Sequence, residues 1–521
     1  MANPSSSRIR NGPNVNHFVI AHDLGTTGNK ATLHDLEGKL VSSAFVGYEV
    51  FYDHAGWAEQ DANDWWRAVC ESTRALITQS GVAKSDIACV TFSGQMMGCV
   101  ALDKNARALR RAIIWADQRS VEQERWLENR ISRDRVYRIT GHRLSASYSL
   151  CKALWLRDNQ PEIFKATDKF VHAKDAIVAR LTGEFVTDHT DASGTNLYDL
   201  EHRAWSSEML EAAQLEPSKW PQIRESTDVV GTVRASIAEE VGLAAGTPVV
   251  IGAGDGMCAA AGAGVVREGS AYNYIGSSSW IALATKKPVF DPTQRTFTWA
   301  HMVPGMFSPC GTMQMAGGSY QWARDQLGSL EVEQAKNENV SAYELLNATA
   351  SASPVGARGL LFLPYLLGER SPRWNPNALG AFIGLTVRHT RADMIRAVLE
   401  GITMNLNVIL EIVGASGIDS MRVIGGGARG RFWNQLMADV YGVPVQRLRT
   451  LEEATSMGAA LAGGIGVGLY EGFEMAEHMN PIEETFTPNL EARARYAKLQ
   501  PIWDAAYHAL EPLFEQLSRF E

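Results

Sequence analysis

Three apolar stretches of this chain each end in a glycine-rich turn, and this recurrence constrains the fold more than any other feature. The turns read DLGTTG at 23–28, GAGDG at 252–256 and GGGARG at 425–430. Two further strands follow the first turn, and helical patterns follow the other two. Strands that alternate with helices are typical of an α/β sheet. A chain of 521 residues also exceeds what one hydrophobic core organises, so we expect two large domains.

Apolar periodicity places the first elements. It predicts a strand over 18–22, a turn at 25–28, a hairpin at 37–38 and a helix over roughly 61–81 whose inner face carries Trp65 and Leu76. Asp61 or Asn63 is expected to cap that helix. A second strand–turn unit begins near 268–280 and a third spans 421–448. We therefore predict a flexible tail over 1–17, a first domain over 18–266 and a second over 267–521, whose last fifty residues look helical.

Composition narrows the partners and the compartment. The net charge of −9 gives no reason to expect nucleic acid, and no apolar run approaches the roughly 20 residues of a membrane span. The six cysteines include no C-x-x-C pair, and most lie in apolar surroundings, which predicts buried free thiols. The histidines form no metal-ligand spacing. We expect a cytoplasmic protein without a structural metal.

The first turn carries groups that suit a phosphate. Asp23 ends a strand, and Gly25, Thr26, Thr27 and Gly28 follow it. Such a turn directs backbone N–H groups into one concavity beside two hydroxyls, and Asp23 at its lip is placed to bind magnesium through water. A plain Gly/Thr hairpin turn with a capping aspartate is the alternative interpretation.

The other two turns resemble dinucleotide-binding loops. Gly425, Gly427 and Gly430 fit G-x-G-x-x-G between a predicted strand and a predicted helix. Against a dinucleotide, too few residues follow for two βαβαβ halves, and no acidic residue ends the next strand. A loop that lets a purine and a ribose lie against the backbone fits as well. The turn at Gly276 and Ser277 also follows a strand, and it suits either a second phosphate contact or a solvated turn.

The loop at 252–256 differs because it holds an aspartate. Gly254, Gly256 and Ala259 fit G-x-G-x-x-A, with Asp255 between the first two. A carboxylate there would face a pyrophosphate with like charge, which counts against that ligand. Asp255 is therefore either a presented carboxylate or the N-cap of the alanine-rich helix that follows.

An ordered set of motifs gives this chain a resemblance to a known family. They are DLGTTGNK, GWAEQDANDWW, SGQMMG, IIWADQR, KALWLRDN, GAGDG, FLPYLLGERSP, GAFIGL, DMIRAVLEG and IGGGARGRFWNQLMAD, spread between about Phe18 and about Gly472. The chain resembles the FGGY carbohydrate kinases, and most closely their xylulokinase branch. The GAFIGLTVRHTRADMIRAVLE stretch is similar to the C-terminal signature of that family throughout.

The resemblance implies a two-domain actin-like (ribonuclease H-like) ATPase fold of the α/β class, with a central cleft between the domains. It implies transfer of the γ-phosphoryl group of ATP, with Mg²⁺, to a hydroxyl of a sugar or polyol. It assigns Asp255 as the general base and Asp23 as the magnesium-linked carboxylate. The implied phosphate contacts are Thr26, Thr27, Gly276 and Ser277, and the implied adenosine contacts are Gly426, Gly427, Ala428 and Asn434. The implied acceptor pocket comprises Gln95, Met96, Met97, Trp115, Asp117, Asp255 and Gly256, although Trp115 fits a core position equally well.

Two positions depart from the xylulokinase pattern. Met97 stands where those enzymes typically carry histidine, and Gly256 where they carry asparagine. Losing a polar partner of a substrate hydroxyl changes specificity by orders of magnitude, so a different ketose, polyol or deoxy sugar stays open beside xylulose. An NAD(P)-dependent oxidoreductase and a non-catalytic sugar sensor are the remaining alternatives. Relatives suggest a possible homodimer.

Overall fold

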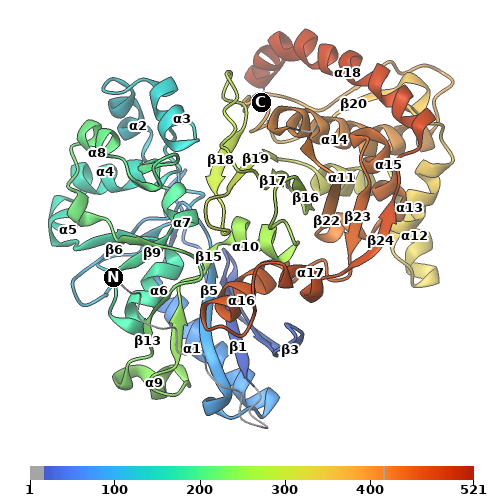
Figure 1. Cartoon of the computed structure of the whole chain (residues 1–521). Coiled ribbons are helices and arrows are strands. Elements are labelled where there is room, and N and C mark those ends of the chain that lie inside the picture. Colours follow the sequence, from blue (N-terminus) through green and yellow to red (C-terminus); the bar gives the residue numbers. More distant parts are fainter. Residues whose placement is uncertain (1–16, 415–416, 521) are drawn as a thin grey trace.

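The computed structural model describes residues 17–414 and 417–520, so the tail predicted over 1–17 lies outside the described residues apart from His17. Two sheet-containing lobes make up the molecule (Figure 1). Residues from the first half of the chain build most of one lobe, and residues from the second half build the other. The predicted α/β class with two domains is confirmed.

The first sheet contains seven strands. β1 pairs with β2 antiparallel and with β5 parallel, and β5 continues in parallel to β14. The short β15 adds to the end of β5. In sheet order the strands are β13 (Val229–Thr232), β14 (Pro248–Val250), β5 (Ile87–Gly94), β1 (Phe18–Leu24), β2 (Gly28–His34) and β3 (Leu40–Gly47), with β15 (Ala253–Gly254) beside β5.

Helix α1 (Ala62–Ser80) shows how sequence determines these elements. Asp61 caps it by accepting from the Asn63 N–H, and Gly81 ends it in a left-handed conformation. The predicted inner face, including Trp65 and Leu76, is buried, so this prediction is confirmed. The other helices of the first sheet are α6 (Ala173–Thr182), α9 (Ala235–Val241) and α10 (Asp255–Gly262).

The second sheet also has seven strands and repeats the connectivity of the first. β16 pairs antiparallel with the next strand, β17, and parallel with the later strand β22, as β1 does with β2 and β5. The turn after β16 at Gly276 is therefore the counterpart of the turn after β1 at Gly25. The strands in sheet order are β18 (Phe297–Ala300), β19 (Phe307–Met313), β17 (Ser279–Leu283), β16 (Ser270–Ile275), β22 (Ser420–Ile424), β23 (Val445–Leu448) and β24 (Ile482–Phe486).

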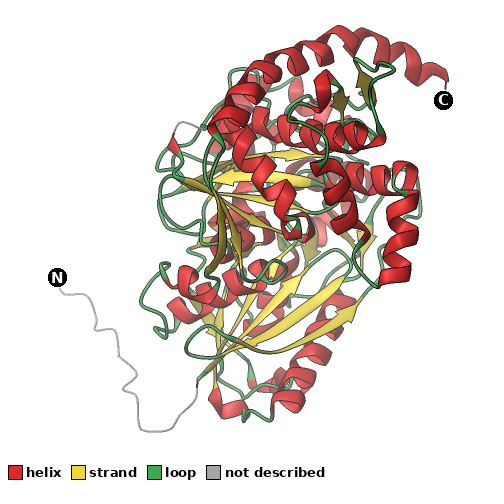
Figure 2. Ribbon diagram, turned by 90° about the vertical axis from the view of Figure 1, so that its right-hand side faces the viewer, coloured by secondary structure: helices red, strands yellow, loops and turns green. Residues whose placement is uncertain are grey.

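Helices cover the outside of this second lobe, as the view turned by 90° shows (Figure 2). Their bounds are α11 (Gly317–Leu327), α12 (Ser329–Glu338), α13 (Ala342–Ser351), α14 (Arg391–Val413), α15 (Arg431–Tyr441) and α18 (Leu490–Leu517). The short α17 (Met475–Met479) packs instead against α10 and α16. The predicted helical character of the last fifty residues is confirmed by α17 and α18, with β24 between them. α18 packs on the second lobe against α14 and α15.

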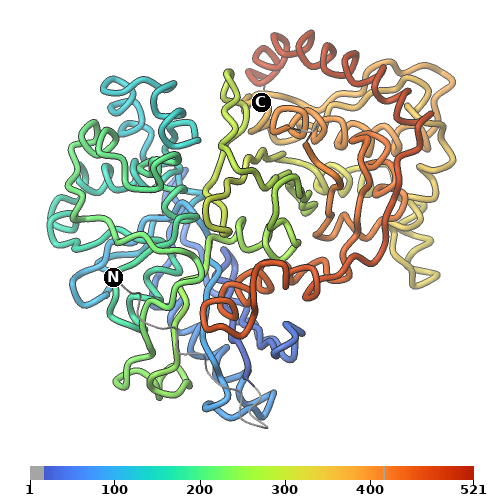
Figure 3. The backbone as a smooth tube through the Cα atoms, in the orientation of Figure 1, coloured from blue at the N-terminus to red at the C-terminus, as the bar shows by residue number. Residues whose placement is uncertain are grey.

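Helix α16 (Ala454–Gly466) crosses between the lobes. Although it comes late in the chain, it packs against α10, β1 and β5 of the first lobe, where the red part of the trace meets the blue part (Figure 3). Two glycines permit this close approach: a Cβ at Gly262 would lie 1.8 Å from Ala454 O, and one at Gly458 would lie 1.9 Å from Cys258 O. The domain division at residue 266 therefore stays a prediction, because 454–466 packs with the first sheet.

A helical layer lies beside the first sheet (Figure 1). It comprises α2 (Val121–Glu128), α3 (Arg133–Thr140), α4 (Ser149–Asn159), α5 (Pro161–Ala166), α7 (His189–Ser193) and α8 (Ser207–Ala213). Short strand pairs complete the fold: β4 (Glu59–Gln60) with β7 (Ala112–Ile113), β6 (Val100–Leu102) with β8 (Lys169–Val171), β9 (Val186–Asp188) with β12 (Gln222–Arg224), β10 (Tyr198–Asp199) with β11 (Ala204–Trp205), and β20 (Leu361–Leu363) with β21 (Ala381–Ile383).

The structure bears on two expectations from composition, the state of the cysteines and the length of the apolar helices. All six cysteines are buried and unpaired, as predicted. Across 17–414 and 417–520, no helix has the length and apolar character needed to cross a lipid bilayer.

Candidate functional site

Two neighbouring cavities meet at one carboxylate. The larger has a volume of about 840 Å³ and lies between residues of both lobes, and the smaller has about 410 Å³. Asp255, Gly256 and Trp280 line both. Any group that Asp255 touches in the larger cavity is therefore adjacent to a ligand of the smaller one.

The local fold determines where Asp255 stands. β15 pairs with β5 in parallel and ends at Gly254, which caps α10, so Asp255 is the first residue of the helix rather than its N-cap. The N-cap interpretation is therefore wrong. The Asp255 side chain is half-buried and accepts from the Gly256 N–H at 2.7 Å. Burial, followed by the nearby charge of Asp23, raises the pKa of Asp255 to about 7.

Asp23 lies at the end of β1, directly opposite Ser93 of the parallel neighbour β5. The Ser93 hydroxyl donates to Asp23 Oδ1 at 2.9 Å. Burial raises the pKa of Asp23 to about 6 despite that hydrogen bond. Lys30, the basic group near it, is paired with Glu453. Asp23 and Asp255 thus form a close pair of carboxylates at the wall of the smaller cavity.

The larger cavity contains most of the predicted acceptor residues. Met96, Met97, Trp115 and Gly256 all line it with Asp255. Met97 adopts a left-handed backbone with φ 62°, which turns the chain sharply after β5. Trp115 is 36 % exposed, and its Nε1 donates to Thr26 Oγ1 at 2.9 Å. The core alternative for Trp115 is therefore wrong.

Gln95 and Asp117 do not reach this cavity. Asp117 is fully buried, where it accepts from Ala58 N at 2.6 Å and pairs with Arg119 at 2.7 Å. The Gln95 amide donates to Gln60 Oε1 at 2.7 Å beneath the first turn. Asp117 is already occupied by protein partners, whereas the Gln95 amide nitrogen donates within the protein and its buried Oε1 has no hydrogen-bond partner among the described residues.

The smaller cavity is closed on one side by the glycine loop after β22. Gly425 and Gly426 line it. The loop then forms a short 3₁₀ turn over Gly426–Arg429 before α15 begins. Asn434 on α15 is buried and donates to Ala428 O at 2.8 Å, so it holds the loop from behind.

Two glycines of this loop differ in how strongly the stability of the fold depends on them. Gly425 has φ +86°, and a Cβ there would lie 2.6 Å from Ile275 O, whereas a Cβ at Gly426 meets nothing within 4 Å. We expect Gly425→Ala to lower the free energy of unfolding by about 2 kcal/mol and Gly426→Ala to leave it within about 0.5 kcal/mol. Chemical denaturation monitored by circular dichroism measures both; equal stabilities for the two variants would contradict this account of the loop.

The remaining predicted phosphate contacts border the cavities without lining them. Thr27 is exposed in the first turn. Gly276 and Ser277 form the turn between β16 and β17, and the Gly317 N–H at the start of α11 donates to Gly276 O at 3.0 Å. Ser278, the next residue, lines the larger cavity. The two turns that follow β1 and β16 are thus placed on the two lobes.

The sequence reasoning missed several groups that the fold brings to the larger cavity. Arg143 and Arg370 come from different lobes and both line it, and the Arg143 guanidinium lies 4.8 Å from the centre of the Trp374 ring. The LGERSP stretch, which contains Arg370, was the available signal, since it formed part of the family resemblance. A buried cluster around Lys174 was also missed because its members lie on two separate segments, 172–175 and 188–191.

Comparison with known proteins shows which family and which relatives this chain resembles. The N-terminal domain of the "FGGY family of carbohydrate kinases" matches residues 18–262, and the C-terminal domain of that family matches residues 271–467. A xylulose kinase of Staphylococcus epidermidis is 34% identical over 508 residues, covering 96% of this chain and 99% of its own. A gluconokinase of Bacillus licheniformis is 30% identical over 511 residues, covering 97% and 98% respectively.

A solved structure shows the same architecture. The crystal structure of a ligand-bound xylulose kinase from Lactobacillus acidophilus superposes with a TM-score of 0.88 at 28% sequence identity, covering 96% of this chain and 100% of that one. The predicted two-domain actin-like arrangement with a cleft between its domains is therefore confirmed.

Proposed function

This chain belongs to the FGGY family of carbohydrate kinases, phosphotransferases with an alcohol group as acceptor, and on that premise we propose the residues and the substrates of its reaction. ATP occupies the smaller cavity, and an open-chain ketose or related polyol occupies the larger one. The γ-phosphoryl group passes to a hydroxyl of that acceptor. Family membership removes the oxidoreductase interpretation of the glycine loops.

The position of Asp255 carries this proposal. A sugar hydroxyl is a weak nucleophile, and phosphoryl transfer requires alignment more than covalent help. Asp255 stands where the two cavities meet, so its carboxylate can accept the hydroxyl proton as the oxygen attacks phosphorus. Its pKa of about 7 lets it take a proton near neutral pH and release it afterwards.

The residues of the smaller cavity fit a magnesium ion. Asp23 and Asp255 line it; burial raises the pKa of both, and the charge of Asp23 further raises the pKa of Asp255. Two close carboxylates are the oxygen donors that Mg²⁺ binds, usually with water completing its shell. Asp23 would hold the ion, and a bound ion would neutralise phosphate charge. Ser93 holds one oxygen of Asp23, and Asp23 lines the cavity.

Backbone groups hold the nucleotide in this proposal. The adenosine lies against Gly426, Gly427 and Ala428, whose loop Asn434 supports from behind. The turns at Thr26–Thr27 and Gly276–Ser277 contact the phosphates from the two lobes. Because the turns belong to different lobes, closure of the cleft aligns the phosphates with the acceptor and excludes water.

The acceptor is a ketopentose or a related sugar or polyol, and D-xylulose is the first candidate. Xylulose kinases and gluconokinases are both among the relatives. Met97 and Gly256 make the pocket more apolar than the xylulokinase pattern, so an acceptor with one fewer hydroxyl to satisfy also fits. A panel of ketoses, aldoses, aldonates and polyols with coupled ADP detection tests this proposal; no ADP release above background with any acceptor would refute it.

Restoring the two polar side chains should favour xylulose. A Cβ at Gly256 would meet only Met96 Sδ, at 3.9 Å, so an asparagine has room, and Met97 already lines the cavity. We expect Met97→His with Gly256→Asn to raise kcat/KM for D-xylulose at least about tenfold, because a buried hydroxyl gains partners. The rate with 1-deoxy-D-xylulose in the same assay is the matched comparison. An unchanged or lower kcat/KM for D-xylulose would contradict the assignment of these two positions.

We also propose a domain division at residue 266, a homodimer and a cytoplasmic location.

A further inference from the structure

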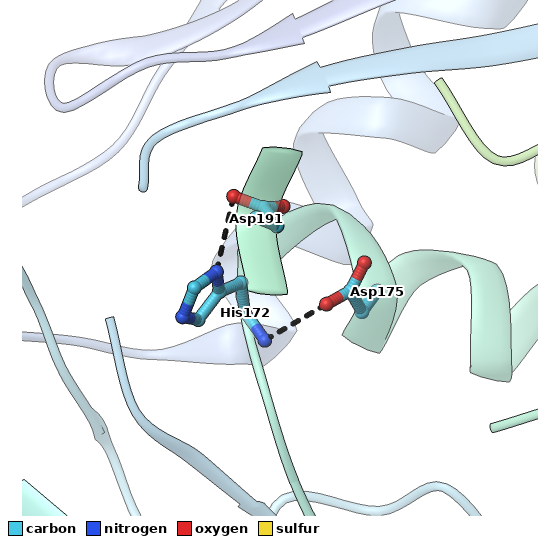
Figure 4. Close-up of side chains that lie close together, drawn as sticks. All are labelled: His172, Asp175 and Asp191. Carbon is cyan, nitrogen blue, oxygen red and sulfur yellow. Dashed lines mark hydrogen bonds and ion pairs between the residues drawn. The ribbon is translucent and has the colours of Figure 1, made fainter. Parts of the chain in front are cut away.

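A cluster of charged side chains lies in the core of the first lobe, apart from both cavities. Lys174, His172, Asp175, Asp188 and Asp191 are each at most 3 % exposed. Figure 4 shows His172 beside Asp191, with the Asp175 carboxylate directed at the His172 backbone. Buried charges on this scale are costly unless they are paired, so the arrangement calls for an explanation.

Lys174, rather than a metal ion, bridges the acidic groups. Lys174 Nζ lies 2.7 Å from Asp175 Oδ1, 2.9 Å from Asp188 Oδ1 and 3.1 Å from Asp191 Oδ2. These carboxylates raise the pKa of Lys174 well above its usual range, against the effect of its burial. An ammonium group that contacts all three carboxylates occupies the position a cation would take. The cluster is therefore an ion network centred on Lys174.

One arm of the network reaches the wall of the larger cavity. Asp191 Oδ1 lies 3.0 Å from His172 Nδ1, and His172 Nε2 lies 2.7 Å from Ser149 Oγ. The Ser149 hydroxyl donates to Gly98 O at 2.7 Å. Gly98 follows Met97, which lines the cavity. The arm therefore ends on the backbone of the segment proposed to contact the sugar.

The other arm reaches the loop that presents Asp255. Asp188 Oδ2 accepts from Thr190 Oγ1 at 2.7 Å. Thr190 Oγ1 in turn accepts from the Gly254 N–H at 2.8 Å. Gly254 caps α10 and directly precedes Asp255. The network thus contacts the backbone next to the proposed base and the backbone of the segment that carries Met97.

We propose that six buried residues, Ser149, His172, Asp191, Lys174, Asp188 and Thr190, are positioning residues that hold the Met97–Gly98 wall in register with Asp255. This inference rests on the proposed function of the two cavities. In-line transfer is sensitive to misplacement of the attacking hydroxyl by about 1 Å, and linked ion pairs and hydrogen bonds in a low-dielectric core resist displacement. The network keeps these two segments at a fixed spacing around the bound acceptor.

Hydrogen exchange tests the coupling without any acceptor. The Cys99 N–H donates to Ile113 O at 2.8 Å beside the far end of the network. Thr190→Val keeps the shape of the side chain but removes its hydroxyl. We expect this change to speed exchange at Cys99 by about tenfold relative to wild type. The buried Tyr496→Phe variant, which loses bonds to Glu400 and Arg396 in the other lobe, should leave Cys99 unchanged. Faster exchange confined to residues around 190 and 254 would overturn the proposal.

Kinetics test the consequence for the reaction, with D-xylulose or the best acceptor of the panel. Ser149→Ala should raise KM for the acceptor about tenfold, and Thr190→Val should lower kcat about tenfold, with KM for ATP unchanged in both. The double variant should lose clearly less than the product of the two effects, because both act through one network. Effects that multiply, or variants that lose only thermal stability as Tyr496→Phe does, would overturn the inference. If wild type shows no activity with any acceptor, the proposed function is refuted, and the exchange result alone then tests the network.

Discussion

Asp255→Asn is expected to lower kcat about 1,000-fold or more while ATP binding stays within about twofold of wild type. Asparagine preserves the size of the side chain at the first turn of α10 but cannot accept the hydroxyl proton. The acceptor must then attack without a base. Single-turnover measurements at saturating ATP and acceptor report the chemical step, and equilibrium dialysis with labelled ATP reports binding.

Asp393→Asn supplies the matched control for Asp255→Asn. Asp393 is also a buried aspartate near a helix start, where it belongs to the capping box of α14 in the other lobe. Its loss should reduce stability and leave kcat within about twofold. A kcat for Asp255→Asn within tenfold of wild type would remove the base assignment.

Asp23→Asn is expected to have the second largest effect, lowering kcat about 100-fold and raising the Mg²⁺ concentration for half-maximal rate at least about tenfold. Asparagine retains the acceptor oxygen for the Ser93 hydroxyl but removes the negative charge that attracts the cation. A Mg²⁺ titration of the initial rate at fixed, saturating ATP measures both changes. Asp393→Asn again serves as control, and an unchanged Mg²⁺ requirement would exclude Asp23 as the metal-linked carboxylate.

The same variant has a directional effect on the pH profile. The base must be ionised, so kcat/KM rises with pH through the pKa of Asp255, which is about 7, and then levels off. The Asp23 charge is one cause of that raised pKa. Removing a like charge makes ionisation easier, so in Asp23→Asn the residual acid limb should move to lower pH. A limb that moves to higher pH would contradict the pairing of the two carboxylates.

Local patterns in the sequence predicted the elements that position this site. The strand before Asp23, the capped helix carrying Trp65 and the strand–loop–helix unit at 421–448 all lie where the periodicity predicted them. Their signals are local, because side-chain alternation, caps and glycine turns depend on neighbours in the chain. The return of α16 to the first lobe was not predictable this way, since it depends on glycine contacts between segments far apart in sequence.

The residues of the candidate site also differ in whether the sequence could identify them. Asp23 and Asp255 were identifiable because Asp23 lies near the end of a strand and Asp255 directly follows one, each within a marked motif. The sequence did not show that the Asp117 carboxylate is already paired, because Arg119 and Ala58 contact it only in the folded chain. The network from Ser149 to Thr190 was also invisible, since its members lie on α4, α6 and α7 and around them. A motif indicates the residue type a reaction needs, whereas contacts between distant segments decide which side chain remains free for it.

The most direct test of the account is ³¹P NMR of the products formed from ATP and the best acceptor of the panel by wild type and by Asp255→Asn. The account predicts that wild type produces ADP and an acceptor phosphate ester in equal amounts, and that Asp255→Asn produces no detectable ester in the same time. Ester formation by Asp255→Asn at the wild-type rate, or ADP accompanied only by inorganic phosphate in wild type, would contradict it.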